Sequence, residues 1–233
     1  MPVRKVPCIL LLTLIAFALP IHGQDWPDLK RFADDNAALA PPAEGEARVV
    51  FMGNSITIGW LHKMPGFFEG KPYVNRGISG QTTPQMLLRF RQDVIALQPR
   101  VVVILAGTND IAGNTGPMTL EQIRDNLVSM AQLARANGIE PVLSSVLPAY
   151  DYPWRPGLNP NLKIPALNAM IEAYAREQNM VYLDYFSAMA DARNGLGPDL
   201  ASDEVHPTLK GYQMMAPLAE KAIAQALEKQ QAD

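Results

Sequence analysis

The segment Val101–Leu105 is a run of five consecutive apolar residues, VVVIL. A strand with one face in water would alternate apolar and polar residues, so this run indicates a strand buried on both faces, as in a parallel sheet covered by helices. Four further strand-like segments occur along the chain, and helical patterns separate them. This alternation predicts βαβ units and a three-layer α/β/α sandwich around a five-stranded parallel sheet of flavodoxin-like type.

The predicted strands are 49–52, 73–75, 101–106, 141–146 and 180–184. The predicted helices are 26–39, 84–97, 120–137, 162–178 and 209–230. We find no internal repeat and no linker rich enough in Gly, Pro or Ser to divide the chain, so residues 24–233 are predicted to form a single domain.

The first 23 residues resemble an export signal. Arg4 and Lys5 precede an apolar run of 12 residues, 8–19, and Gly23 ends a plausible cleavage region. The run is shorter than the roughly 20 apolar residues that a membrane-spanning helix needs. We therefore expect an exported protein, periplasmic or secreted, without a stable membrane anchor.

Composition excludes several kinds of site and partner. Without residues 1–23 the chain has 18 basic and 23 acidic residues, a net charge of −5, and no basic run, which argues against nucleic acid as a partner. The one cysteine, Cys8, leaves with the signal, so no disulfide, thiol nucleophile or thiolate metal site is expected. Of three histidines, only His62 and His206 are expected to remain, which excludes a metal site built from a cluster of histidines. We expect neither a metal nor a cofactor.

A serine lies where the first predicted strand gives way to a helix, in the turn Gly53-Asn54-Ser55. Ligands in α/β folds bind at the carboxyl ends of the strands, so this turn would present Ser55 at the ligand side of the sheet. Strand–glycine–helix junctions are also ordinary structural turns, and a functional interpretation needs convergent partners.

The sequence Asp203-Glu204-Val205-His206-Pro207 precedes the last predicted helix. On a tight turn, the Asp203 carboxylate could accept a hydrogen bond from the His206 Nδ1–H, which would leave Nε2 free as a base. The alternative is a solvated acidic turn in which His206 is an ordinary surface residue, and Glu204 is a competing carboxylate.

Two further polar motifs follow predicted strands. Gly107-Thr108-Asn109-Asp110 is either a polar turn that caps a helix or a source of a side-chain amide for an oxyanion. In the segment 75–80, NRGISG, a glycine could bring a backbone N–H close to a substrate oxygen.

Taken in order, GNSI, the glycine after the second strand, GTND and DxxHP resemble the SGNH (GDSL-type) hydrolase family over nearly all of residues 24–233. The resemblance implies a serine ester hydrolase in which Ser55 is the nucleophile, His206 its base and Asp203 the residue that orients the base. It further implies an oxyanion hole formed by the Ser55 N–H, the Gly77 N–H and the Asn109 side chain. The chain departs from the family pattern in having GNSI for GDSL and DEVHP for the commoner D-G-x-H-P.

Within the family, GNSI and NRGISGQTT look most like platelet-activating-factor-type acetylhydrolases and bacterial carbohydrate O-acetyl esterases. The resemblance therefore implies hydrolysis of short acyl esters, acetyl above all, on a carbohydrate or other small molecule. We predict substrate contacts from Asn54, beside the nucleophile, and from Tyr150 and Trp154 in the long loop 147–160, which is also expected to expose Tyr152. That loop could equally be packed to close the sheet.

Other functions remain open at this stage. A lysophospholipase or arylesterase would use the same residues on lipid or aryl esters, and a non-catalytic carbohydrate-binding module would keep only the fold. A phosphate-binding loop is disfavoured because the Ser55 turn has one glycine and no lysine. We interpret His62 as a partly exposed helix residue rather than a second base. Acyl length, alcohol and oligomeric state are not fixed by these residues.

The export signal makes a direct prediction. Exported material should begin near residue 24, because cleavage is expected after Gly23. Amino-terminal sequencing of protein recovered outside the cytoplasm tests this, and a mature chain that still starts at Met1 would contradict it.

Overall fold

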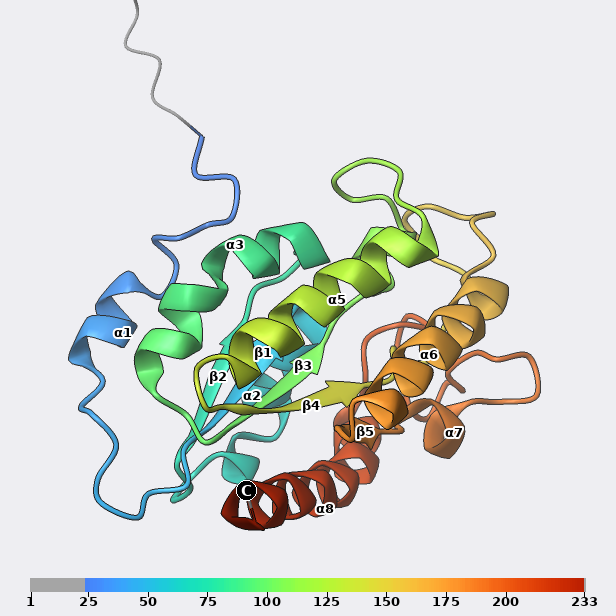
Figure 1. Cartoon of the computed structure of the whole chain (residues 1–233). Helices are drawn as coiled ribbons and strands as arrows, with labels where there is room; N and C mark the ends of the chain where they lie inside the picture. The colour runs from blue at the N-terminus through green and yellow to red at the C-terminus, as the bar shows by residue number, and fades with distance from the viewer. Residues whose placement is uncertain (1–23, 233) are drawn as a thin grey trace, which may run out of the picture.

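The structure, a computed structural model, describes residues 24–232, so the predicted signal peptide lies outside the described residues. A five-stranded sheet with the order β2-β1-β3-β4-β5 forms its centre, and every neighbouring pair of strands is parallel (Figure 1). The strands are β1 Val49–Gly53, β2 Tyr73–Gly77, β3 Val101–Leu105, β4 Glu140–Ser144 and β5 Val181–Leu183. The predicted fold class is confirmed.

Helices cover both faces of the sheet (Figure 1). The longer ones are α2 Ser55–Lys63, α3 Thr83–Asp93, α5 Leu120–Arg135, α6 Pro160–Glu177 and α8 Leu209–Ala232. Shorter segments are α1 Ala33–Ala38, α4 Thr108–Ile111, α7 Phe186–Met189 and the 3₁₀ turns η1 Pro65–Phe67 and η2 Ile95–Leu97.

Alternate residues of each strand belong to different hydrophobic clusters. Val50 and Met52 of β1 pack in the cluster that holds residues of α3, α5 and α6, whereas Val49 and Phe51 pack in the cluster that holds residues of α2 and α8. All five residues of β3 are buried, which is why its sequence shows no polar alternation. Burial of each such side chain contributes about 1.5–3 kcal/mol.

Aromatic packing fixes the helix that follows β1. Trp60 of α2 stacks on Phe67 at 4.3 Å between ring centroids and on Tyr212 of α8 at 5.6 Å. The Tyr212 hydroxyl also donates to the Ile56 carbonyl at 2.8 Å. Because Ile56 is the second residue of α2, these contacts hold the amino end of that helix against α8.

The amino-terminal helix differs from its prediction. We expected a helix over 26–39, but α1 spans only Ala33–Ala38. The Asp25 carboxylate accepts the N–H groups of Leu29 and Lys30 at 2.8 and 3.0 Å, and Asp28 has φ 56°. Side-chain caps and a left-handed residue favour turns over a continuous helix, so residues 26–32 form turns instead.

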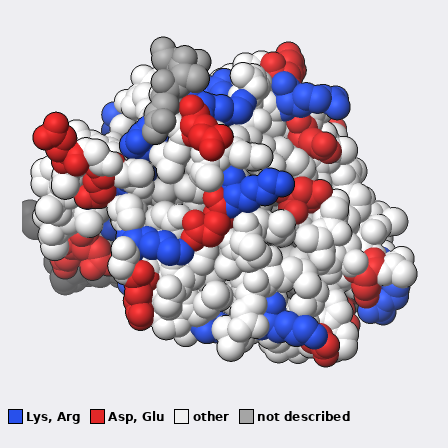
Figure 2. Space-filling view, turned by 90° about the horizontal axis from the view of Figure 1, so that it is seen from below, with Lys and Arg blue, Asp and Glu red and all other residues white. Residues whose placement is uncertain are grey.

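The surface mixes charges of both signs. On the face in Figure 2, acidic and basic side chains lie interspersed among uncharged atoms, and no continuous basic stripe crosses this face. None of the helices described is long and apolar enough to cross a membrane. Within residues 24–232, no group of three or more His, Cys, Asp or Glu side chains is arranged to hold a metal ion.

Candidate active site

Ser55 lies at the junction between β1 and α2. Its neighbour Asn54 caps the helix, because the Asn54 Oδ1 accepts the Ile56 N–H at 3.0 Å. Ser55 is the first residue of α2, so its own N–H has no partner within the helix and lies at the positive end of the helix dipole. The turn therefore presents a hydroxyl and an N–H at the carboxyl end of the sheet.

His206 connects Ser55 to a carboxylate. The His206 Nε2 lies 2.9 Å from the Ser55 Oγ, and the Nδ1 lies 2.7 Å from the Asp203 Oδ2. The other Asp203 oxygen accepts the backbone N–H groups of Val205 and His206 at 3.1 and 2.7 Å. The structure thus brings together the three residues that the sequence assigned to nucleophile, base and orienting acid.

The Asp203 carboxylate is held in its ionised form. Burial raises the pKa of this carboxyl, but hydrogen bonds from the backbone and ring of His206 outweigh burial and lower the pKa below its ordinary value. Because the folded pKa is the lower one, ionised Asp203 stabilises the fold above the ordinary pKa of an aspartate, and this stabilisation is lost as pH falls through the lowered value. At neutral pH, Asp203 is therefore ready to orient the imidazole.

The turn between Asp203 and His206 contains a left-handed residue. Glu204 has φ 65°, a conformation that glycine adopts at least cost. The family pattern D-G-x-H-P places glycine at this position, and the structure supplies the reason. The Glu204 side chain is exposed and makes no contact with His206 that would compete with Asp203 within the described residues.

Asn109 follows β3 on the short helix α4. Gly107, at φ 127°, makes the turn into α4, and Asn109 is 4% exposed. The Asn109 Nδ2 donates one N–H to the Gln81 carbonyl at 2.9 Å, and its second N–H has no acceptor among residues 24–230, so it can donate to a ligand. This bond also ties the loop after β2 to the turn after β3.

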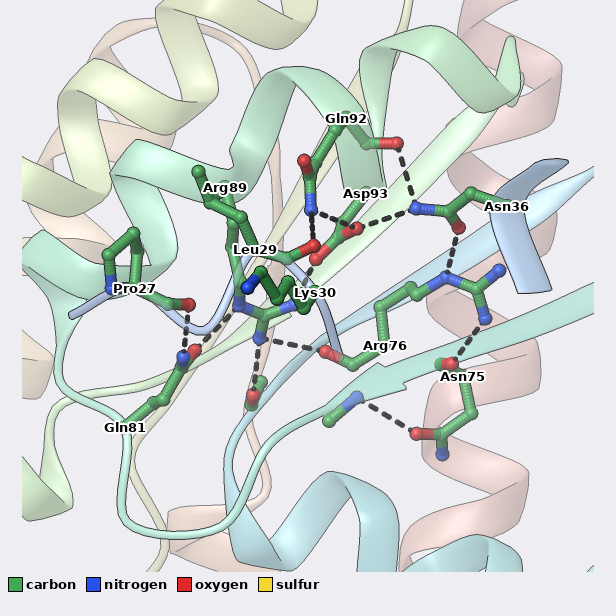
Figure 3. A network of polar contacts seen from close by, with 12 residues as sticks. Pro27, Leu29, Lys30, Asn36, Asn75, Arg76, Gln81, Arg89, Gln92 and Asp93 are labelled. Carbon is green, nitrogen blue, oxygen red and sulfur yellow. Dashed lines mark hydrogen bonds and ion pairs between the residues drawn. The ribbon is translucent and has the colours of Figure 1, made fainter. Parts of the chain in front are cut away.

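Gly77 was predicted to supply an oxyanion donor, and the structure contradicts this. The Gly77 N–H donates to the Asn75 Oδ1 at 3.0 Å (Figure 3). The Asn75 Nδ2 in turn donates to the Thr57 carbonyl at 2.7 Å. A Cβ at residue 77 would clash with the backbone of Asn54 and Ile58. Gly77 is therefore required because β2 and α2 approach closely there.

Gly80, three residues further on, is a candidate N–H donor that the sequence analysis did not single out. It is exposed, has φ 77°, and its N–H has no acceptor within the described residues. Its loop is fixed on both sides, since the Ile78 N–H donates to the Gly53 carbonyl at 3.1 Å and the Gln81 carbonyl accepts from Asn109. The sequence offers two glycines in NRGISG, Gly77 and Gly80, and nothing in it shows which of the two has a free N–H.

Two further predictions about side chains were wrong. Asn54, predicted to contact substrate, is 1% exposed and uses its side-chain oxygen to cap α2. Tyr152, expected to be exposed, is fully buried, and its hydroxyl lies 3.0 Å from the Thr108 Oγ1. The loop 147–160 is thus partly the packed loop that was the alternative interpretation.

The same loop brings Trp154 next to the base. The Trp154 ring lies 6.2 Å from the His206 ring between centroids, is stacked on Tyr152 at 5.2 Å, and is 46% exposed. Tyr150 is 41% exposed, and the Arg193 guanidinium lies 4.5 Å from its ring centroid. Of these two predicted substrate contacts, Trp154 is the one that adjoins a residue of the triad.

A cavity of about 340 Å³ opens beside Ser55. Its other lining residues come from the amino-terminal turns, from α2 and from the end of β2 with the loop after it: Arg31, Ile58, Gly59, His62, Gly77, Ile78 and Ser79. Its volume is at the small end of the range for ligand sites, roughly 300–1,000 Å³.

His62 lies on the exposed side of α2, seven residues after Ser55. Although it lines the cavity, its ring makes no hydrogen bond or ion pair with another side chain of residues 24–230. It therefore lacks the orienting acid that His206 has.

Comparison with known proteins gives consistent matches. The model of the GDSL-like Lipase/Acylhydrolase family matches residues 51–214. The solved structure of a GDSL-like lipase from Bacteroides thetaiotaomicron is 49% identical and superimposes with a TM-score of 0.84, covering 86% of this chain and 99% of that one.

Curated relatives are more distant. Esterase TesA of Pseudomonas aeruginosa is 29% identical over 170 residues, 71% of this chain and 78% of that protein. An acetylxylan esterase of Geobacillus stearothermophilus is 27% identical over 155 residues, 61% of this chain and 68% of that protein. The chain spans only 32% of the length of another relative, lipoprotein YqeF of Bacillus subtilis, with 38% identity over 78 residues.

The two histidines should behave differently. We expect His206→Ala to lower kcat for a small ester by about 10³-fold or more, because Ser55 loses its base. His62→Ala, which removes an imidazole from the same cavity without touching the triad, should keep kcat within about threefold. Steady-state kinetics of both variants test this, and equal losses in the two would contradict the assignment of the base.

Proposed function

Because the chain belongs to the GDSL-like lipase/acylhydrolase family and is a carboxylic ester hydrolase, we propose that it is an exported serine esterase that removes short acyl groups, acetyl above all, from a carbohydrate. The observation that supports this reaction best is the hydrogen-bonded chain Ser55–His206–Asp203, with distances of 2.9 and 2.7 Å. These hydrogen bonds also disfavour a non-catalytic carbohydrate-binding module, because such a module does not need an oriented base.

The first half-reaction is acyl transfer to Ser55. As the Ser55 Oγ attacks the ester carbonyl, the His206 Nε2 takes the hydroxyl proton, and the Asp203 carboxylate stabilises the resulting imidazolium. The tetrahedral intermediate collapses, His206 returns the proton to the departing alcohol, and an acyl-enzyme remains. Water then attacks the acyl-enzyme by the same proton path and releases the carboxylic acid.

The oxyanion of the intermediate needs hydrogen-bond donors. The Ser55 N–H at the amino end of α2 and the free N–H of the Asn109 side chain supply two. We assign the third to the Gly80 N–H, because the Gly77 N–H already donates to Asn75 and the loop of Gly80 is bonded to Asn109 through Gln81.

Removing the amide donor should show its contribution. Asn109→Ala is expected to lower kcat by about 10²- to 10³-fold with a small change in KM, because the interaction forms chiefly in the transition state. Steady-state kinetics on p-nitrophenyl acetate measure this. A variant that keeps the wild-type kcat would remove Asn109 from the oxyanion hole.

The substrate proposal has two supports. A cavity of about 340 Å³ beside Ser55 has room for an acyl group, and exposed Trp154 beside His206 offers a flat face on which a sugar ring can stack. The acetylxylan esterase among the relatives acts on an acetylated glycan by its name. Export is supported by the signal-like residues 1–23.

A panel of p-nitrophenyl esters and acetylated xylan tests the substrate. We expect the highest kcat/KM with acetate among the acyl chains and release of acetic acid from the glycan, with Ser55→Ala inactive on all of them. A preference for octanoate or longer would instead favour a lipid-directed esterase.

Trp154→Ala, assayed with the same panel, distinguishes recognition of the sugar from recognition of the acyl group. The variant should raise KM for the glycan several-fold, because the sugar ring loses the indole face on which it stacks. KM for p-nitrophenyl acetate, which has no sugar ring, should stay nearly unchanged. Tyr150→Ala is the matched control, since Tyr150 is similarly exposed but pairs with Arg193. Equal effects of Trp154→Ala on both substrates would contradict a sugar-stacking role.

A further inference from the structure

A fully buried arginine contacts the segments that lead into the turns of the active site. Arg89 of α3 is 0% exposed and is not part of the triad or of the oxyanion hole. Burying a guanidinium is costly unless hydrogen bonds and an opposite charge compensate. The partners of Arg89 show what this charge does in the fold.

Its side chain uses four of its five N–H donors on separate acceptors (Figure 3). The Nη2 donates to the Gly53 carbonyl at 3.0 Å and to the Arg76 carbonyl at 2.9 Å. The Nε donates to the Gln81 Oε1 at 2.6 Å, and the Nη1 pairs with Asp93, also fully buried, at 3.0 Å.

Three of these acceptors belong to the segments that carry catalysis. Gly53 is the last residue of β1, two residues before Ser55, and Arg76 is near the end of β2. Gln81 holds Asn109 through its backbone carbonyl while its side chain is held by Arg89. One planar group therefore fixes the nucleophile turn, the end of β2 and the loop that contains Gly80 relative to one another.

A second layer holds the arginine itself. Besides Arg89, the Asp93 carboxylate accepts from the Asn36 Nδ2 at 2.7 Å, and the Asn36 Oδ1 accepts from the Arg76 Nε at 2.9 Å (Figure 3). The Gln81 Nε2 donates to the Pro27 carbonyl at 2.8 Å. The amino-terminal segment therefore makes hydrogen bonds to the side chains of Gln81 and Asp93, the two residues that hold the Arg89 side chain.

We propose that Arg89 is a positioning residue for catalysis, which sets the geometry of the oxyanion hole by fixing the Gly80–Gln81 loop and the Ser55 turn at the same time. The inference rests on ester hydrolysis at Ser55 and not on the identity of the acyl group or the alcohol. A displacement of about 1 Å between nucleophile and oxyanion donors can cost on the order of 10²-fold in rate.

The test is Arg89→Lys, which keeps the charge next to Asp93 but cannot reach four acceptors in one plane. With p-nitrophenyl acetate we expect kcat to fall by about 10- to 100-fold and KM to change by less than about threefold. Labelling of Ser55 by a fluorophosphonate should slow by a similar factor, which makes the readout independent of the natural substrate.

Arg48→Lys is the matched control. Arg48 is also buried, at 5% exposed, and donates to Glu46 and to the carbonyls of Leu97 and Ala40, but it precedes β1 at the opposite end of the sheet. It should lower the Tm comparably and leave kcat within about threefold of wild type. If Arg48→Lys lowers kcat as much as Arg89→Lys, general destabilisation explains the loss and the proposal is overturned.

A double-mutant cycle with Asn109→Ala gives a second decision. If Arg89 acts through the oxyanion hole, Arg89→Lys should lower kcat by a smaller factor in the Asn109→Ala background than in the wild type, because one of the donors that it positions is already gone. A full, independent loss in that background would overturn the proposal, as would a wild-type rate in Arg89→Lys alone.

Gln81 provides the same test should Arg89→Lys fail to fold. Gln81→Leu removes the acceptor of the Arg89 Nε, whereas Gln81→Glu keeps it, and both lose the bond to the Pro27 carbonyl. We expect kcat to fall about tenfold in Gln81→Leu and to be largely restored in Gln81→Glu. Equal rates in the two variants would show that the link from Arg89 to the loop does not position the site.

Discussion

The first three strands of the sheet end at the same level: Gly53 of β1 pairs with Gly77 of β2 and with Leu105 of β3. Because parallel strands are locked by their backbone hydrogen bonds, the turns that follow them start from fixed points a few ångströms apart. The Ser55 turn, the Gly80 loop and the Asn109 helix are these turns. The chemistry of the site therefore depends first on strand register, and side-chain hydrogen bonds refine it.

The sequence predicts most of the architecture because burial leaves a strong pattern. β3 is apolar throughout since helices cover both its faces, and Thr119 with Gln122 forms the capping box that begins α5. The amino-terminal segment was predicted less well. Apolar spacing there suggested one long helix, but the Asp25 carboxylate caps the N–H groups of Leu29 and Lys30 and keeps this part of the chain in turns.

The site was predictable in its reacting groups and less so in its supporting ones. Ser55, His206 and Asp203 stand out because acyl transfer at a serine uses a nucleophile, a base and an acid that orients the base, and because GNSI and DxxHP resemble the motifs of the GDSL-type family. The role of Gly77 could not be read from the chain, because it depends on the Asn75 side chain and on the proximity of α2. Arg89 looks like an ordinary helical charge in the sequence, and only tertiary structure reveals that it is buried beneath the active site.

The left-handed backbone at Glu204 has a consequence for the rim of the site. Since the turn itself aligns Asp203 with His206, the residue at 204 is free to vary wherever the fold tolerates a conformational cost of about 1–2 kcal/mol. Glutamate at that place adds an exposed negative charge next to the catalytic imidazole, which glycine would not. Because salt screens exposed charges, the contribution of Glu204 to the electrostatic potential beside His206 falls as the ionic strength rises, while the Asp203–His206 geometry is unchanged.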